Sequence, residues 1–149
     1  LNINWLLRPH PSEDLSIYNT TFESYSNVVV SNKGSVVDSI IGAEFIIHFD
    51  CTTAIEGVWA GKRAISFLPF AEASLMAWLP VLLSAQTENY EELSNVVRNT
   101  LLDRKNLPEP DKAALKTADG FLRGVTDAAA ETIAQVIESL DLQKMRVVL

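Results

Sequence analysis

The sequence contains very little cysteine, since Cys51 is the only one among 149 residues. This excludes an internal disulfide, and Cys51 with the two histidines, His10 and His48, supplies too few ligands for a structural zinc site. The fold needs neither a disulfide nor a metal site for stability, because a domain of this length buries about two-thirds of the surface that its unfolded chain exposes. With 48% hydrophobic and 21% charged residues, the composition is that of a globular domain.

Basic residues are also scarce. Lys and Arg total 12 against 19 Asp and Glu, for a formal net charge of −7, and the basic residues do not cluster. Phosphate contacts supply most of the affinity of general nucleic-acid binding, so this composition argues against a nucleic-acid partner. A few basic side chains could still hold one small anion.

Long apolar segments and a leader are missing as well. The uncharged run over residues 73–86 is broken by Pro80 and falls short of the roughly 20 apolar residues of a membrane span. No basic region followed by an apolar stretch opens the chain, so we expect a cytoplasmic protein. The chain begins with Leu1 and becomes strand-like almost at once, which suggests a fragment of a larger protein.

Two common phosphate-binding loops are absent. There is no Gly-x-Gly-x-x-Gly, and Gly57, Gly61 and Lys62 do not have the spacing of a Walker loop. A nucleotide site, if present, must use other residues.

Hydrophobic periodicity predicts alternating strands and helices in the first half of the chain. The expected strands are 3–7, 27–30, 44–49 and 63–67; the expected helices are 35–41, with Ser35 as N-cap and Gly42 as stop, and 52–60, with Thr52 or Thr53 as N-cap and Gly61 past its end. Short helical crossovers imply a parallel sheet. The predicted fold class is therefore α/β, a Rossmann-like three-layer α/β/α domain.

The second half is less regular. We expect helices at 72–78, 90–102, 111–122 and 127–140, a short strand at 81–84, a cap at Thr87 and a loop at 107–110. The helix at 127–140 has the clearest apolar stripe. Acidic residues at 13–14 and 88–92 are interpreted as solvated or capping positions.

Arg8-Pro9-His10-Pro11-Ser12-Glu13-Asp14 follows the first expected strand, where ligands bind in open parallel sheets. The two prolines restrict the backbone on either side of His10, so its imidazole is aimed rather than free. Beside Arg8, it could donate hydrogen bonds to a phosphate. The alternative is a stiff turn with an exposed histidine.

A second candidate segment runs from His48 to Gly57, from the third strand into a helix. The hydroxyls of Thr52 and Thr53 could bind phosphate oxygens at the helix start, and Glu56 could accept hydrogen bonds from ribose hydroxyls. Thr53-Ala54-Ile55-Glu56 also matches a helix capping box, which would occupy the Glu56 carboxylate.

Together, these segments resemble a known family. Arg8-Pro9-His10-Pro11 is similar to the His-Pro motif of nucleotide-sugar transferases with the GT-B fold. Asp50-Cys51-Thr52-Thr53-Ala54-Ile55-Glu56, followed by Gly61-Lys62-Arg63-Ala64-Ile65-Ser66-Phe67, is similar to their second nucleotide-binding segment, with Arg63 where proline is common. The resemblance is strongest over residues 3–69. It is closest to bacterial capsule and O-antigen biosynthesis proteins, and more distant to Kdo and sialic-acid transferases, CDP-glycerol glycerophosphotransferases and UDP-GlcNAc 2-epimerases.

The resemblance implies that residues 1–149 form one domain, the C-terminal donor-binding half of a glycosyltransferase for bacterial surface polysaccharide. The missing N-terminal GT-B domain would be its partner, a CMP-, CDP- or UDP-linked sugar its substrate, and no metal or other cofactor would be required. It implies a catalytic residue, His10, and substrate-binding residues Arg8, Ser12, Thr52, Thr53 and Glu56, with Glu56 on the ribose.

Two other functions stay open: a sugar-nucleotide epimerase of the same fold, and a non-catalytic nucleotide-binding or docking module. The isolated chain is expected to be inactive in any of these cases. Family members that extend lipid-linked glycans suggest peripheral association with the inner membrane. An apolar surface at Phe67, Phe70 and Trp78 could give dimers in solution.

Overall fold

The structure is a computed structural model that describes residues 3–70, 76–102, 109–110 and 112–122. The chain divides into two compact units, Leu1–Gly42 and Ala43–Leu149. The expectation of a single domain over residues 1–149 stays a prediction.

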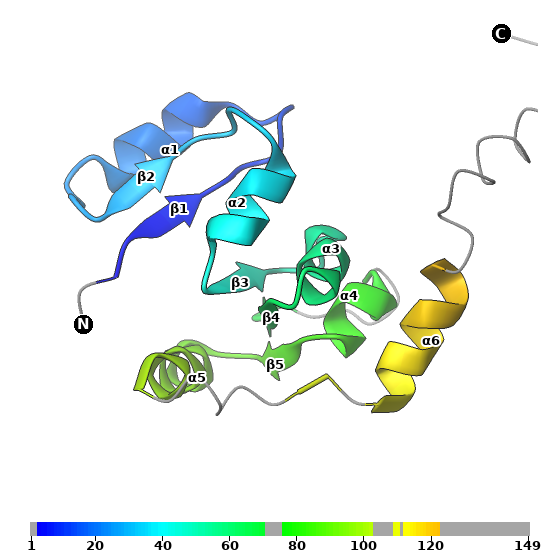
Figure 1. Ribbon diagram of the computed structural model, residues 1–149. Coiled ribbons are helices and arrows are strands. Elements are labelled where there is room, and N and C mark those ends of the chain that lie inside the picture. Colours follow the sequence, from blue (N-terminus) through cyan, green and yellow to red (C-terminus); the bar gives the residue numbers. More distant parts are fainter. Residues whose placement is uncertain (1–2, 71–75, 103–108, 111, 123–149) are drawn as a thin grey trace, which may run out of the picture. The chain divides into compact units, whose positions relative to one another are not determined.

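The first unit is built on two parallel strands. Its elements are β1 (Trp5–Leu7), α1 (Leu15–Phe22), β2 (Val28–Val30) and α2 (Val36–Gly42) (Figure 1). Trp5 pairs with Val28 and Leu7 with Val30. At the start of α2, the Ser35 hydroxyl accepts a hydrogen bond from the Val37 N–H at 3.1 Å, which confirms Ser35 as a cap.

Helix α1 is not among the helices predicted from the sequence, although two parallel strands require a crossover connection. The Asp14 side chain caps this helix by accepting from the Ser16 N–H at 2.9 Å. No residue of α1 is buried, so the helix lacks the strong apolar stripe on which sequence periodicity depends.

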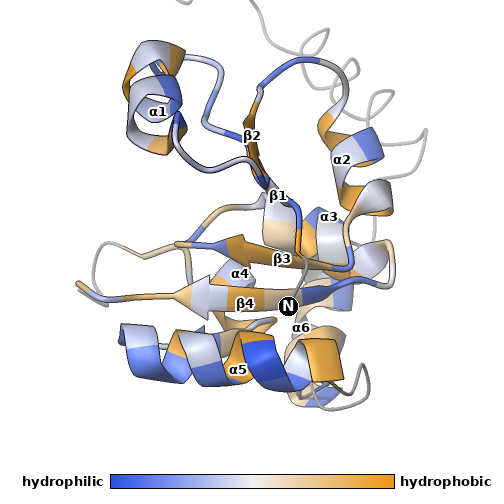
Figure 2. Ribbon diagram, turned by 90° about the vertical axis from the view of Figure 1, so that its left-hand side faces the viewer, coloured by the Kyte–Doolittle hydropathy of each residue, from blue (hydrophilic) through white to orange (hydrophobic). Residues whose placement is uncertain are grey.

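The second unit contains a three-stranded sheet between helices. Its described elements are β3 (Phe45–His48), α3 (Thr53–Trp59), β4 (Arg63–Phe67), α4 (Trp78–Leu82), β5 (Ala85–Thr87), α5 (Tyr90–Leu102) and α6 (Lys112–Leu122). The strands lie in the order β3-β4-β5 and are all parallel. Helices α3 and α4 cover one face and α5 covers the other (Figures 1 and 2). The predicted α/β class with parallel strands is confirmed, and this unit has the layers expected of a Rossmann-like arrangement.

Central strand β4 is the most deeply buried strand: Ala64 is buried, and Ile65 and Ser66 are fully inaccessible to solvent. Buried polar groups on the sheet have partners, since the Ser66 hydroxyl donates to the Phe49 carbonyl at 2.9 Å and the Thr87 hydroxyl to the Ser66 carbonyl at 3.0 Å. Figure 2 shows that β3 and β4 are largely hydrophobic, whereas α5 has hydrophilic residues on its outer side. A further cluster of Leu83, Ala114 and Ala118 joins α4 to α6.

Helix α3 ends as predicted. Gly61 lies just past it with φ +75°, a conformation that glycine adopts without steric cost. The Gly61 N–H donates to the Val58 carbonyl at 3.0 Å, and the Lys62 N–H to the Gly57 carbonyl at 2.8 Å. This is a Schellman motif, which satisfies the last carbonyls of the helix before β4 begins.

The predicted strand at 81–84 is wrong, because these residues follow or belong to helix α4, and the strand is β5. Pro80 occupies the first turn of α4, where its missing N–H costs nothing. The Ser84 hydroxyl then donates to the Pro80 carbonyl at 2.7 Å. A short apolar run has no periodicity that distinguishes a strand from a buried helix.

The predicted cap of the helix at 90–102 is also wrong, although the bounds of α5 are confirmed. Thr87 is the last residue of β5 and is buried. The Asn89 side chain caps the helix by accepting from the Glu92 N–H at 3.0 Å, and the Glu92 carboxylate accepts from the Glu88 N–H at 2.8 Å. Glu92 thus has the capping role expected for this acidic segment.

Other expectations fall partly or wholly outside the described residues. The expected helix at 111–122 is confirmed as α6 over its described part. The expected helix at 127–140, most of that at 72–78 and the first half of the loop at 107–110 lie outside the described residues. Within the described residues, no helix is both long and apolar enough to cross a membrane.

Gly57 allows α3 to lie directly on β3, because a Cβ at this position would collide with the Ile46 side chain. We expect Gly57→Val to lower the free energy of unfolding by about 1 kcal/mol, the low end of the range for overpacking, because the collision is with the terminal methyl of Ile46. Urea denaturation measures this change in the free energy of unfolding. Gly120→Ala is the matched control: it adds a methyl group in open space on α6 and should stabilise by up to about 1 kcal/mol. Equal stability of Gly57→Val and the wild type would contradict this packing.

Candidate functional site

The first candidate segment, residues 8–14, connects the carboxyl end of β1 to α1. Its centre is a turn in which the Glu13 N–H donates to the His10 carbonyl at 2.9 Å. Pro11 follows His10 in this turn, at the position that proline favours. The loop is therefore a hydrogen-bonded turn between a strand and a helix cap, as its two prolines predict.

Arg8 is used to connect two loops of the first unit. Its guanidinium donates to the Gly34 carbonyl at 2.7 Å, the Lys33 carbonyl at 2.8 Å and the Asn32 carbonyl at 3.3 Å. It also donates to the Ser39 hydroxyl at 3.3 Å. Because most of its donors are directed at these acceptors, Arg8 positions the loop after β2, and the phosphate contact expected for it stays a prediction.

His10 is exposed, and its hydrogen bonds lie within its own loop. The ring Nδ1 lies 2.6 Å from the Ser12 Oγ, and the Ser12 N–H donates to it at 3.3 Å. The His10 main-chain N–H donates to the Glu13 carboxylate at 2.6 Å, which also accepts from the Tyr18 hydroxyl at 2.8 Å. The loop thus holds the backbone and one ring nitrogen, and Nε2 makes no hydrogen bond to the described residues.

Ser12 was expected among the ligand-binding residues, whereas Glu13 and Tyr18 were not expected at the site. In the structure, Ser12 and Glu13 both form hydrogen bonds with His10. The role of Tyr18 could not be found without α1, because only the helix brings its hydroxyl back to Glu13. These hydrogen bonds lower the pKa of Glu13, that from Tyr18 most strongly, and raise the pKa of Tyr18.

The second candidate segment lies at the start of α3, after the carboxyl end of β3. Thr52 occupies the N-cap position, but its side chain makes no capping hydrogen bond. Thr53 already belongs to the helix, and its hydroxyl accepts from the Cys51 thiol at 3.1 Å. The capping box Thr53-x-x-Glu56 therefore does not form. Glu56 is exposed, and its carboxylate makes no hydrogen bond to the described residues.

His48, in the same segment, is a buried structural residue with only 8% of its surface exposed. Its Nδ1 accepts from the Cys51 N–H at 3.2 Å, so Nε2 carries the proton and donates to the Ser84 hydroxyl at 2.8 Å. Ser84 in turn donates to the Pro80 carbonyl. In this tautomer His48 cannot remove a proton from Ser84, which excludes the pair as a nucleophile and general base.

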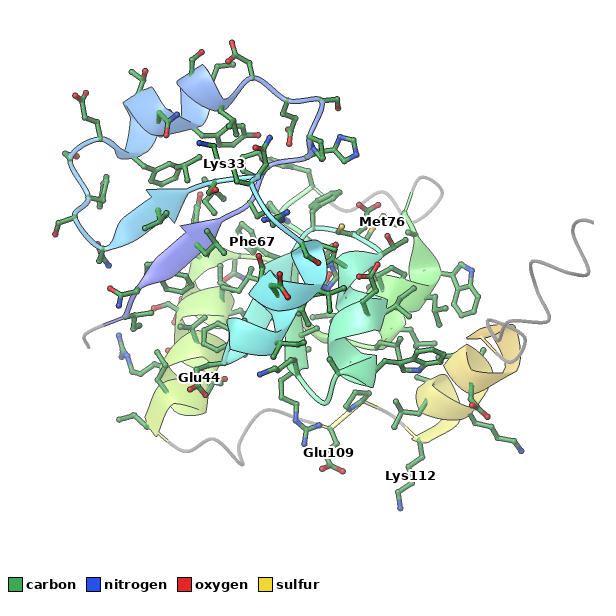
Figure 3. The ribbon with its side chains drawn as sticks, turned by 45° about the horizontal axis from the view of Figure 1, so that its top comes forward. Lys33, Glu44, Phe67, Met76, Glu109 and Lys112 are labelled. Carbon is green, nitrogen blue, oxygen red and sulfur yellow. The ribbon has the colours of Figure 1, made fainter. Side chains whose placement is uncertain are left out.

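A hollow of about 340 Å³ lies at the opposite edge of the second unit's sheet. Its lining includes Phe45 and Arg63, the first residues of β3 and β4, together with Glu44, Lys62 and Thr100. Arg63 forms an ion pair with Glu109 at 2.8 Å, whereas Lys112 points away (Figure 3). The hollow contains none of the predicted site residues. The positive charges of Lys62 and Arg63 are largely balanced by the negative charges of Glu44 and Glu109.

The apolar surface expected near the end of β4 is present in part. Phe70 is 88% exposed and Trp78 is 51% exposed. Phe67 is only partly exposed, and its ring packs against that of Tyr90 with centroids 5.3 Å apart. The expectation of a dimer stays a prediction.

Comparison with protein-family models, curated proteins and solved structures finds no match to this chain. Among the described residues, no group of three or more His, Cys, Asp or Glu side chains could hold a metal ion. The family resemblance therefore rests on the sequence motifs alone.

We expect Arg8→Lys to lower the free energy of unfolding of the first unit by about 1–2 kcal/mol, because one ammonium group cannot replace the forked contacts to several carbonyls. Amide hydrogen exchange at Lys33 and Val37 should become faster. Lys33→Ala is the matched control, since only the main chain of Lys33 meets Arg8. Unchanged exchange in Arg8→Lys would show that Arg8 does not hold this loop.

Burial lowers the pKa of His48 to about 4, against a smaller opposing effect of Asp50. An unfolded histidine has a pKa of about 6.5. Between about pH 4 and pH 6.5, the unfolded state therefore binds a proton at His48 that the folded state does not bind. Acidification therefore favours unfolding, with a contribution of about 3 kcal/mol lost by about pH 4.

The free energy of unfolding of wild type and His48→Gln, measured in urea at about pH 7 and about pH 4.5, isolates this contribution. The wild type should lose more stability than the variant on acidification. The same loss in both proteins would show that His48 does not cause it.

Proposed function

We propose that this chain is the donor nucleotide-sugar-binding domain of a glycosyltransferase that builds bacterial surface polysaccharide. The observation that carries the proposal is the loop after β1, which holds His10 by its backbone and by Nδ1, while the residue is exposed and its Nε2 makes no hydrogen bond to the described residues. This loop follows the carboxyl end of a parallel strand, where α/β proteins bind their ligands. An exposed imidazole held in this way has the properties needed to donate a hydrogen bond to a phosphate oxygen.

The start of α3 supports the same function. The Thr52 hydroxyl and the Glu56 carboxylate are both exposed and do not cap the helix, so they can bind a ligand without a loss of helix contacts. In the proposal, Thr52 and Thr53 donate to phosphate oxygens, and Glu56 accepts from ribose hydroxyls.

His10 would act in the transfer step by stabilising charge. As the bond between the sugar and the phosphate breaks, negative charge grows on the departing nucleotide, and a donor already aimed at that oxygen stabilises it without reorganisation. One such donor contributes on the order of 3 kcal/mol to lowering a barrier. The acceptor and its general base are assigned to the missing N-terminal domain.

Calorimetric titration of the 149-residue chain with CMP, CDP, UDP and GDP tests this function. We expect one nucleotide to bind selectively and His10→Ala to weaken it by about 10- to 100-fold, as for one lost hydrogen bond to a charged group. Asn19→Ala, on the exposed surface of α1, is the control. Thr52→Val should also weaken binding without lowering the melting temperature, because Thr52 makes no capping bond.

The identity of the nucleotide narrows the substrate class. Selective cytidine binding would favour Kdo, sialic-acid or glycerol-phosphate chemistry, and uridine binding would favour hexosamine chemistry. No binding to this chain or to the full-length protein would refute the proposal. In the full-length protein, nucleotide release from a uridine-linked sugar without an acceptor would identify an epimerase instead. A bound nucleotide without transfer would identify a non-catalytic module.

A further inference from the structure

We propose that Ser12 is a positioning residue that sets the tautomer of His10, while Glu13 and Tyr18 hold the His10 main chain in place. The inference rests on the proposed function for the role of His10. It changes the role of Ser12 from a ligand contact to a group that acts through the imidazole.

The Ser12 main chain determines which ring nitrogen of His10 carries the proton. An amide N–H can only donate, and it reaches the His10 Nδ1 at 3.3 Å. Nδ1 must therefore accept, so the proton of the neutral imidazole lies on Nε2. The Ser12 hydroxyl, 2.6 Å from the same nitrogen, donates to it as well. Both groups of Ser12 thus stabilise the one tautomer that presents an N–H donor outward.

The Glu13 carboxylate holds the His10 backbone. Its two carboxylate oxygens accept from different elements: one from the His10 N–H at 2.6 Å, the other from the Tyr18 hydroxyl of α1 at 2.8 Å. The pKa of Glu13 is lowered mainly by the Tyr18 hydrogen bond and further by the His10 N–H. Glu13 is therefore ionised at neutral pH, in the state in which it can accept both bonds.

These contacts reduce the freedom that a histidine on an exposed loop would otherwise have. With Nδ1 engaged, the ring cannot present Nδ1 to a ligand, and with the N–H engaged, the backbone stays in the turn. A donor held in advance loses less entropy on binding than a mobile one. Ser12 and the Glu13–Tyr18 pair would therefore raise the affinity for a phosphate without touching it.

Long-range ¹H–¹⁵N correlation spectra of the labelled, ligand-free 149-residue chain test the tautomer. They are recorded at about pH 8.5, well above the ordinary histidine pKa of about 6.5. We expect the wild type to show Nε2–H as the dominant form. Ser12→Ala should raise the Nδ1–H fraction at least twofold, toward that of a free peptide spanning residues 8–14. Ser12→Thr, which keeps the hydroxyl, should restore the wild-type spectrum.

Tyr18→Phe separates the effect on the His10 ring from the effect on the His10 backbone. It should leave the tautomer unchanged and accelerate hydrogen exchange of the His10 main-chain amide several-fold. A dominant Nδ1–H form in the wild type, or identical ring spectra in wild type and Ser12→Ala, would overturn the role of Ser12. Unchanged amide exchange in Tyr18→Phe would overturn the backbone role.

Adding CMP or UDP to the same samples distinguishes this inference from the proposed function. If the function holds, Ser12→Ala should weaken nucleotide binding several-fold and Ser12→Thr should restore it. The expected tautomers without any nucleotide binding would refute the proposed function while supporting the effect of Ser12 on the ring. Nucleotide binding together with a dominant Nδ1–H form would support the proposed function and refute the effect of Ser12 on the ring.

Discussion

Parallel strand pairing is the constraint on which the rest of this structure depends. The strands are only three to five residues long, and each pair within a sheet is joined through a helix, because parallel neighbours cannot be connected by a tight turn. In each unit, the loops that lead from strands to helices therefore leave the same edge of the sheet. That edge has His10 in the first unit and Thr52 and Glu56 in the second.

Polar side chains that look alike in the sequence have different roles once their partners are known. Arg8 and His48 were both expected near a ligand, or in a segment that binds one. Arg8 donates to the carbonyls of a neighbouring loop, and His48 is buried with both ring nitrogens engaged. His10 and Glu56 remain exposed. The number of hydrogen bonds that the fold already uses, rather than the residue type, separates structural groups from those that can bind a ligand.

Sequence patterns were most informative where one physical signal dominated. The continuous apolar runs of β3 and β4 and the amphipathic pattern of α5 were recognised with bounds close to those observed. Helix α1 was missed because it buries no residue, and residues 81–84 were misassigned because an apolar run containing Pro80 fits a short helix as well as a strand. The cap of α5 was placed two residues early, since a threonine at the end of a buried strand resembles a capping residue.

For the candidate site, the sequence by itself determined which residues follow the strands and that two prolines restrict the backbone around His10. These are properties of neighbours along the chain. Only the tertiary structure decided that Ser12 and Glu13 hold His10, that Tyr18 supports them from α1, and that Thr53 and Glu56 form no capping box. The physical reason is that a hydrogen bond requires two groups at a particular distance and angle. That geometry depends on where each helix begins and how it packs, which residue order alone does not specify.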